Sequence, residues 1–470
     1  MSENPELQSG LPRFTRKGLI IIAIAAILAF GLYNILPYSN SANKGLALLL
    51  FIAILWFTEA VHITITAFMI PVLAILIGIT TKDAKTGGDV AMSIKQAMST
   101  FADPIIFLFF GGFALATALH IQKLDKKIAM WLISLSGSHL GIATIAICGV
   151  TAALSMWISN TATAAMMLPL ALGMLTHLDQ EKDRSTFVFI LLGIAYSASI
   201  GGLGTLVGSP PNAIAAAALE MDFTEWMKVG LPMMLVLLPL MLLTLYIVLR
   251  PNLNRKIQLE TEEIPWNLTR VMTMILFLCT ALAWIFGKNI SAIVGFNVSD
   301  SWVALSAAIL VVTLGLATWG DVAKGTDWGV LMLFGGGLTL SALLRDSGAS
   351  LALGQEVARV FGNAPHIVII AVVAVFIIIL TEFTSNTASA ALLVPVFATI
   401  AAQIGLPKEV LVLVIGIGAS CAFMLPVATP PNAVVFGTGL IRQREMMKAG
   451  AFLSLGCVVI LTLYTYFFLM

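Results

Sequence analysis

Long apolar runs separated by short charged connectors make up most of the chain. No Asp, Glu, Lys or Arg occurs from 128 to 178, from 185 to 219, from 383 to 407 or from 410 to 441. A membrane-spanning helix needs about 20 mostly apolar residues, so each of these stretches holds one or two crossings. The pattern predicts an all-α polytopic membrane protein with about 11 transmembrane helices and two re-entrant hairpins.

The two halves of the chain repeat three motifs in the same order. The motif pairs are FGGFALATAL at Phe110 with FGGGLTLSAL at Phe334, SNTATAAMMLPLA at Ser159 with SNTASAALLVPVFA at Ser385, and SPPNAIAAA at Ser209 with TPPNAVVFG at Thr429. Their nearly constant offsets of 224, 226 and 220 residues indicate an internal duplication, a hallmark of secondary transporters. We expect inverted repeats whose broken helices meet at one site near the middle of the membrane. The glycine-rich segments from Phe110 to Leu119 and from Phe334 to Ala342 are expected to form the re-entrant hairpins.

A polar triplet lies in the middle of a long apolar run in each repeat. The triplets are Ser159, Asn160 and Thr161 in the first repeat and Ser385, Asn386 and Thr387 in the second. Small polar residues are poor choices inside a helix, but their side-chain oxygens cap the free N–H groups of a helix start. Each triplet therefore predicts a break between two half-helices. Lipid tolerates such a break only where it faces protein or a water-filled cavity.

Paired prolines at 210–211 and 430–431 predict a second break in each repeat. Proline lacks a backbone N–H group and stops the preceding turn from continuing as a helix. The carbonyl groups of Gly208 and Ala428, just before the prolines, are thereby left free. In transporters with broken helices, unwound carbonyls of this kind coordinate sodium.

Composition and charge narrow the class of ligand. The chain of 470 residues is 59% hydrophobic and 10% charged, whereas soluble proteins average about 25% charged. Its net charge of +1 gives no basic field for nucleic acid. No Lys or Arg occurs from 155 to 169, from 197 to 219 or from 383 to 395, so an anion bound there relies on helix N-termini, hydroxyl and amide donors, and bound cations. Two facing triplets suit a dicarboxylate, and bound sodium would couple its affinity to the ion gradient.

The positive residues Arg13, Arg16 and Lys17 precede the first apolar run, which predicts an uncleaved first helix and a cytoplasmic N-terminus.

Glu59 and Glu382 interrupt other apolar runs. A carboxylate at membrane depth is a candidate functional group, although both residues also suit helix ends. For Glu382 the pattern favours a structural or gating role over ion or substrate binding.

Motifs of enzymes and of metal centres are missing from the sequence. It contains no H-E-x-x-H, G-x-S-x-G or Walker-type motif, so it is not expected to be an enzyme or a pump. The four cysteines lie singly inside apolar runs, which predicts free thiols.

The paired triplets and Pro-Pro-Asn segments resemble the divalent anion/sodium symporter family of dicarboxylate, citrate and sulfate carriers, over nearly the whole length. The resemblance implies an elevator-type homodimer in the bacterial inner membrane, with sodium as the co-transported ion. It implies that substrate contacts Ser159, Asn160, Thr161, Ser385, Asn386, Thr387 and Pro430. The implied sodium ligands are Ser155, Ser159, Asn160 and Gly208 for one ion, and Thr381, Thr384, Asn386 and Ala428 for another. Where many members have Pro after the TEA segment, this chain has His62.

The resemblance also divides the chain into parts. They are a cytoplasmic segment at 1–17, scaffold helices at 18–100, a first transport repeat at 101–228, scaffold helices and the central connector at 229–325, a second transport repeat at 326–447, and a C-terminal scaffold helix at 448–470. The expected activity is sodium-driven import of succinate, malate or fumarate. Sodium-independent exchange, and citrate or sulfate as the carried anion, are the alternatives.

Overall fold

The computed structural model describes residues 16–82, 89–134, 137, 139–176, 178–255, 264–361 and 364–470. Arg13 and the rest of segment 1–15 lie outside the described residues, so the orientation drawn from the N-terminal charges stays a prediction.

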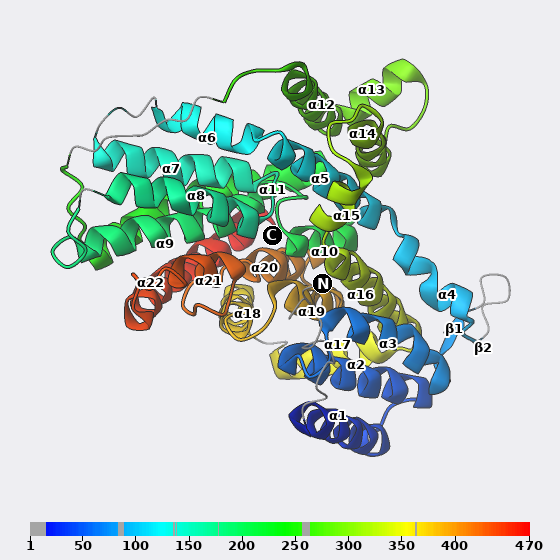
Figure 1. Cartoon of the computed structure of the whole chain (residues 1–470). Helices are drawn as coiled ribbons and strands as arrows, with labels where there is room; N and C mark the ends of the chain where they lie inside the picture. The colour runs from blue at the N-terminus through cyan, green and yellow to red at the C-terminus, as the bar shows by residue number, and fades with distance from the viewer. Residues whose placement is uncertain are drawn as a thin grey trace, which may run out of the picture.

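Helices form almost all of the regular structure (Figure 1). The first half of the chain contains α1 (Arg16–Ile35), α2 (Asn40–Thr58), α3 (Ile63–Leu76), β1 (Thr80–Lys82), β2 (Asp89–Ala91), α4 (Ile94–Met98), the 3-10 helix η2 (Ser99–Ala102), α5 (Pro104–Ile121), α6 (Leu124–Ser134), α7 (Leu140–Ser155), α8 (Asn160–Leu175), α9 (Arg184–Gly201), the 3-10 helix η3 (Gly202–Gly204), α10 (Pro210–Leu219) and α11 (Phe223–Leu249). The second half contains α12 (Leu268–Ile285), α13 (Gly287–Val294), α14 (Asp300–Thr313), α15 (Trp319–Gly325), α16 (Trp328–Asp346), α17 (Ala349–Phe361), α18 (His366–Thr381), α19 (Asn386–Gln403), α20 (Lys408–Gly418), α21 (Pro430–Phe436) and α22 (Gln443–Phe468). The two short strands pair antiparallel, with Thr80 opposite Ala91.

Nine helices among the described residues are long and apolar enough to cross a bilayer, or ten if the bent pair α17–α18 counts as one span. The prediction of an all-α polytopic membrane protein is confirmed. Helices α7 and α8 are apolar but have only 16 residues each, a length of about 24 Å against a hydrocarbon core of about 30 Å. These two helices contact each other and lie side by side in Figure 1, so they form a helical hairpin whose arms are each shorter than that core.

Equivalent helices of the two repeats exchange partners. Helix α10 of the first repeat packs against α19 of the second, and α21 of the second packs against α8 of the first. In a similar way, α5 of the first repeat packs against α14, which precedes the second repeat, and α16 of the second repeat packs against α3, which precedes the first. The repeats therefore interlock, and each supplies half of the centre of the molecule.

The glycine-rich segments do not form the hairpins expected of them. The segment from Phe110 lies inside the continuous helix α5, and the segment from Phe334 lies inside the continuous helix α16. A Cβ atom on Gly111 would lie 2.5 Å from Ala304 Cβ on α14, and one on Gly336 would lie 2.6 Å from Ala67 Cβ on α3. The glycines thus allow two equivalent helix pairs to approach closely, which is the usual role of small residues between membrane helices. The hairpin turns lie at the polar triplets instead.

Candidate cation and anion site

Both polar triplets lie at helix starts, as the sequence predicts. Ser159 precedes α8 with an extended backbone, and its hydroxyl accepts a hydrogen bond of 3.3 Å from the N–H group of Ala162. Ser385 precedes α19 in the same way and accepts one of 3.4 Å from Ala388. The serine caps the new helix, so the asparagine that follows it is the first helical residue.

The first oxygen cluster surrounds the side-chain amide of Asn160. The inward-pointing end of this amide lies 2.7 Å from Ser155 Oγ, 3.1 Å from the Ala198 carbonyl oxygen and 3.2 Å from the Gly208 carbonyl oxygen. With its nitrogen turned inward, the amide donates hydrogen bonds to these oxygens. With its oxygen turned inward, four oxygens face one another. A cation bound among them would favour that second orientation, because it would attract all four oxygens.

The second oxygen cluster is built from equivalent residues of the second repeat. Thr381 Oγ1 lies 2.6 Å from Asn386 Oδ1 and 2.8 Å from the Ala419 carbonyl oxygen. In the first cluster, Ser155 Oγ lies 2.7 Å from both Asn160 Oδ1 and the Ala198 carbonyl oxygen. Each repeat therefore brings a hydroxyl, an amide oxygen and a carbonyl oxygen to one point.

The carbonyl groups of Ala198 and Ala419 are members of the two clusters that sequence reasoning missed. The signal that identifies them is a repeated Ala-Ser dipeptide, Ala198-Ser199 and Ala419-Ser420, at an offset of 221 residues. A backbone carbonyl group does not depend on the type of side chain, so the repeated dipeptide is the sequence feature that could have predicted these two residues.

Other predicted ligands are engaged elsewhere. Ser159 caps α8, and Thr384 Oγ1 donates to the Leu380 carbonyl oxygen at 2.9 Å and lies 2.7 Å from Ser389 Oγ. The backbone of Ala428 is held by its N–H group, which donates to the Leu425 carbonyl oxygen at 3.2 Å, and its carbonyl group stays a predicted ligand. The structure therefore joins Ser155, Asn160 and Gly208 in the first cluster, and Thr381 and Asn386 in the second.

The asparagine of each Pro-Pro-Asn segment holds the second break of its repeat in shape. Asn212 Nδ2 donates to the carbonyl oxygens of Gly202 and Thr205, both at 2.7 Å. Asn432 Nδ2 donates to those of Ala422 at 3.2 Å and Leu425 at 3.0 Å. Both side chains are fully buried. The unwound segments that carry the free carbonyls are thereby fixed rather than left loose.

The predicted substrate residues lie at three helix starts, those of α8, α19 and α21. Ser159, Thr161 and Pro430 are exposed, whereas Thr387 is buried. Ser209 of the first break and Ser420 of the second lie together, with 3.3 Å between their hydroxyl oxygens. Because these serines directly follow Gly208 and Ala419, this contact links the two oxygen clusters across the repeats.

Glu59 and His62 lie at helix ends. Glu59 ends α2 in the left-handed conformation and is exposed. His62 begins α3, where its Nδ1 atom accepts a hydrogen bond of 3.3 Å from the N–H group of Thr64. Both residues therefore shape a turn between helices.

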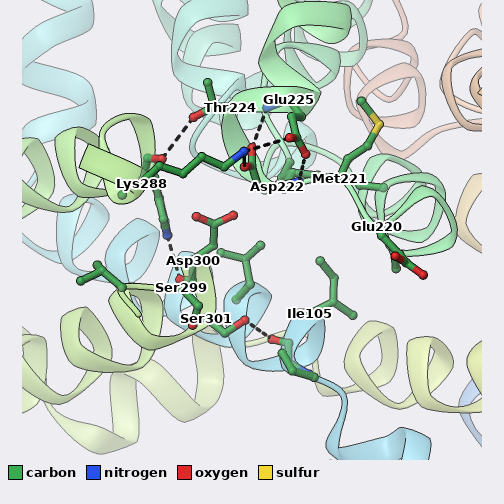
Figure 2. A pocket seen from close by; sticks show the side chains of 18 of the residues that line it. Ile105, Glu220, Met221, Asp222, Thr224, Glu225, Lys288, Ser299, Asp300 and Ser301 are labelled. Carbon is green, nitrogen blue, oxygen red and sulfur yellow. Dashed lines mark hydrogen bonds and ion pairs between the residues drawn. The ribbon is translucent and has the colours of Figure 1, made fainter. Parts of the chain in front are cut away.

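A separate cavity of about 510 Å³ opens beside the starts of α11 and α14 (Figure 2). Lys288 Nζ lies 2.7 Å from Asp222 Oδ2 and 2.9 Å from Glu225 Oε1 on its wall. These hydrogen bonds raise the pKa of the Lys288 ammonium above its usual value. The lysine is therefore neutralised by its own partners and does not make this cavity an anion site.

The donor set of the two clusters suits a hard cation. It consists of hydroxyl, amide and carbonyl oxygens, and such oxygens are what broken-helix transporters offer to sodium. Within the described residues, no three His, Cys, Asp or Glu side chains come together to hold a metal ion.

The duplicated, interlocked helices with paired breaks define a multi-pass secondary transporter rather than an enzyme. The family model described as the sodium:sulfate symporter transmembrane region matches residues 13–470. The chain therefore belongs to the sodium:sulfate symporter family, the divalent anion/sodium symporters that its motifs resemble.

Two relatives are similar to this chain in sequence, and one solved structure is similar in fold. An "uncharacterized transporter" of Haemophilus influenzae is 54% identical, over 97% of this chain and 98% of its own length. The sodium-dependent dicarboxylate transporter SdcS of Staphylococcus saprophyticus is 32% identical, over 96% of this chain and 90% of its own. The crystal structure of the YdaH transporter of Alcanivorax borkumensis shares the fold, with a TM-score of 0.56 at 14% identity, over 87% of this chain and 99% of that one.

Proposed function

We propose that this protein is a sodium-coupled symporter that imports four-carbon dicarboxylates such as succinate, malate and fumarate. The observation that carries the proposal is the pair of equivalent oxygen clusters, one from each repeat, each at the start of a half-helix. The stretches that contain them have no Lys or Arg. Positive charge for a dianion must then come from helix N-termini and bound cations.

Coupling follows from this charge balance. Two sodium ions in the clusters would offset the two negative charges of a dicarboxylate, so the anion binds more tightly when sodium is bound. By linkage, the anion raises the affinity for sodium by the same factor. If an arginine bound the anion, anion affinity would not depend on bound sodium, and the sodium gradient would not drive anion uptake.

The choice of anion is supported by a relative and by symmetry. SdcS, at 32% identity, is named as a sodium-dependent dicarboxylate transporter. Two triplets at two helix starts match a ligand with one carboxylate at each end. Citrate and sulfate use the same donors and are the alternative anions, and sodium-independent exchange is the alternative mechanism.

We further propose that the protein works as a homodimer with an elevator mechanism in the inner membrane of a bacterium, with a cytoplasmic N-terminus. The moving part comprises 101–228 and 326–447, and the scaffold comprises 18–100, 229–325 and 448–470. Contacts between the two parts include those of α5 with α14, of α16 with α3 and of α18 with α22.

Uptake of labelled succinate into proteoliposomes tests the proposal. With an inward sodium gradient we expect initial uptake about 10-fold or more above that with choline, because coupling energies of this kind correspond to factors of about 5 to 150. Equal uptake in sodium and in choline would contradict sodium coupling and favour the exchanger.

A thermal-shift screen of purified protein identifies the anion. Succinate, malate, fumarate, citrate and sulfate are each added with and without sodium. We expect a dicarboxylate to raise the melting temperature most, and only with sodium, because a ligand stabilises the state that binds it. A larger rise with citrate or sulfate would replace the dicarboxylate in the proposal.

A further inference from the structure

A buried carboxylate organises the second break of the second repeat. Glu382 is fully buried, and its Oε1 atom accepts hydrogen bonds from the N–H groups of Phe423 at 2.7 Å and Met424 at 2.9 Å. Its Oε2 atom accepts a third from Leu425 at 3.0 Å. Three consecutive backbone N–H groups of the unwound segment between α20 and α21 therefore point at one side chain.

The first repeat lacks this carboxylate. At the offset of 226 residues that relates the triplets, the residue equivalent to Glu382 is Met156. There the break is closed by the Thr205 hydroxyl, which donates to the Met156 carbonyl oxygen, and by a close approach between Gly202 and Gly208. The two oxygen clusters therefore share a hydroxyl, an amide oxygen and a carbonyl oxygen, but only the second has a carboxylate next to it in the chain.

The carboxylate lies next to the second oxygen cluster along the chain, and the segment that it binds follows a residue of that cluster. Glu382 directly follows Thr381, whose hydroxyl belongs to that cluster. The segment that Glu382 holds begins just after Ala419, which supplies the carbonyl oxygen of the cluster. Asn432 Nδ2 donates to the carbonyl oxygens of Ala422 and Leu425 in the same segment.

We infer that Glu382 is a positioning residue for the second cation site and makes this site the tighter of the two for sodium. The inference rests on the proposed function. Two physical effects act together. The three hydrogen bonds fix the segment that follows the Ala419 carbonyl group. The negative charge attracts a cation in the neighbouring cluster, and low-dielectric surroundings strengthen that attraction.

Sodium titrations of wild type and Glu382→Gln test the inference. Glutamine has the same shape but no charge, and its amide nitrogen cannot accept the hydrogen bond from Leu425. We expect the sodium concentration for half-maximal succinate uptake to rise about 10-fold or more, with maximal uptake at saturating sodium largely kept. The sodium-induced rise in melting temperature, measured without succinate, should shift by the same factor.

Two further variants separate charge from shape. Glu382→Asp keeps the charge on a shorter side chain, and we expect a sodium requirement between those of wild type and Glu382→Gln. Glu59→Gln removes the other carboxylate of an apolar run, at an exposed helix end, and should leave the sodium requirement unchanged.

Each outcome decides the inference. If Glu382→Gln lowers maximal uptake while its half-maximal sodium concentration equals that of wild type, the residue is only a structural support and the inference is wrong. If Glu382→Gln cannot be purified, Glu382→Asp decides alone, since an unchanged sodium requirement would contradict the inference. Wild-type uptake that ignores sodium would instead refute the proposed function, and the choline control of the same preparation reveals this separately.

Discussion

Sodium-dependent uptake is expected to disappear when either cluster asparagine is replaced by alanine. Asn160→Ala removes the amide from the first cluster, and Asn386→Ala removes it from the second. A hydrogen-bonding group that faces a charge contributes about 1.5–3 kcal/mol, which corresponds to roughly 10- to 150-fold in sodium affinity. At ordinary sodium concentrations, uptake should therefore fall to the level of empty liposomes.

The matched control is Asn34→Ala, an exposed asparagine on α1 whose Nδ2 donates to the Phe30 carbonyl oxygen of the same helix. We expect uptake by this variant to equal that of wild type. Size-exclusion chromatography should show the same oligomer for wild type and all three variants, since both cluster asparagines are partly exposed at helix starts rather than part of the core. Normal sodium-driven uptake by both Asn160→Ala and Asn386→Ala would remove the site assignment.

Gly202→Ala should disable the first cluster although it replaces none of the residues that supply the oxygens. A Cβ atom at this position would lie 2.5 Å from Asn160 Oδ1 and 3.0 Å from the Gly208 carbonyl oxygen. The methyl group must push both atoms away, at a cost of about 1–3 kcal/mol for overpacking. We expect loss of sodium-coupled uptake together with a modest fall in melting temperature.

Gly149→Ala is the control for this glycine. It lies inside α7, on the same hairpin as the first triplet, and nothing lies within 4 Å of its Cβ position. Alanine favours a helix over glycine by about 1 kcal/mol, so uptake should be unchanged and the melting temperature equal or slightly higher. A Gly202→Ala protein with the sodium requirement of wild type would show that the first cluster does not bind the ion.

Several features of the site could be predicted because they depend on local chemistry. The triplets break their helices because serine caps a helix start wherever it occurs. The paired prolines break theirs because they lack N–H groups. Neither effect needs a distant partner, so both breaks appear where the sequence predicts them.

The glycine segments show where this reasoning fails. Gly111 and Gly336 fit a tight turn or a close helix contact equally well by sequence. The choice depends on Ala304 and Ala67, which lie far away in the chain and leave no room for a side chain. Similarly, the Ala198 and Ala419 carbonyl groups join the clusters only because the ends of α9 and α20 lie beside the triplet of their own repeat.

The sequence by itself determined the membrane class, the duplication and the positions of the four breaks. These features depend on the length of apolar runs, the offset between motifs and local hydrogen-bonding groups, all of which can be read from the sequence without knowing any distant contact. Only the tertiary structure decided which segments are hairpins, which carbonyl groups complete each cluster, and that Glu382 holds the second break. Those features depend on contacts between segments distant in sequence, where packing space and backbone direction determine what a residue touches.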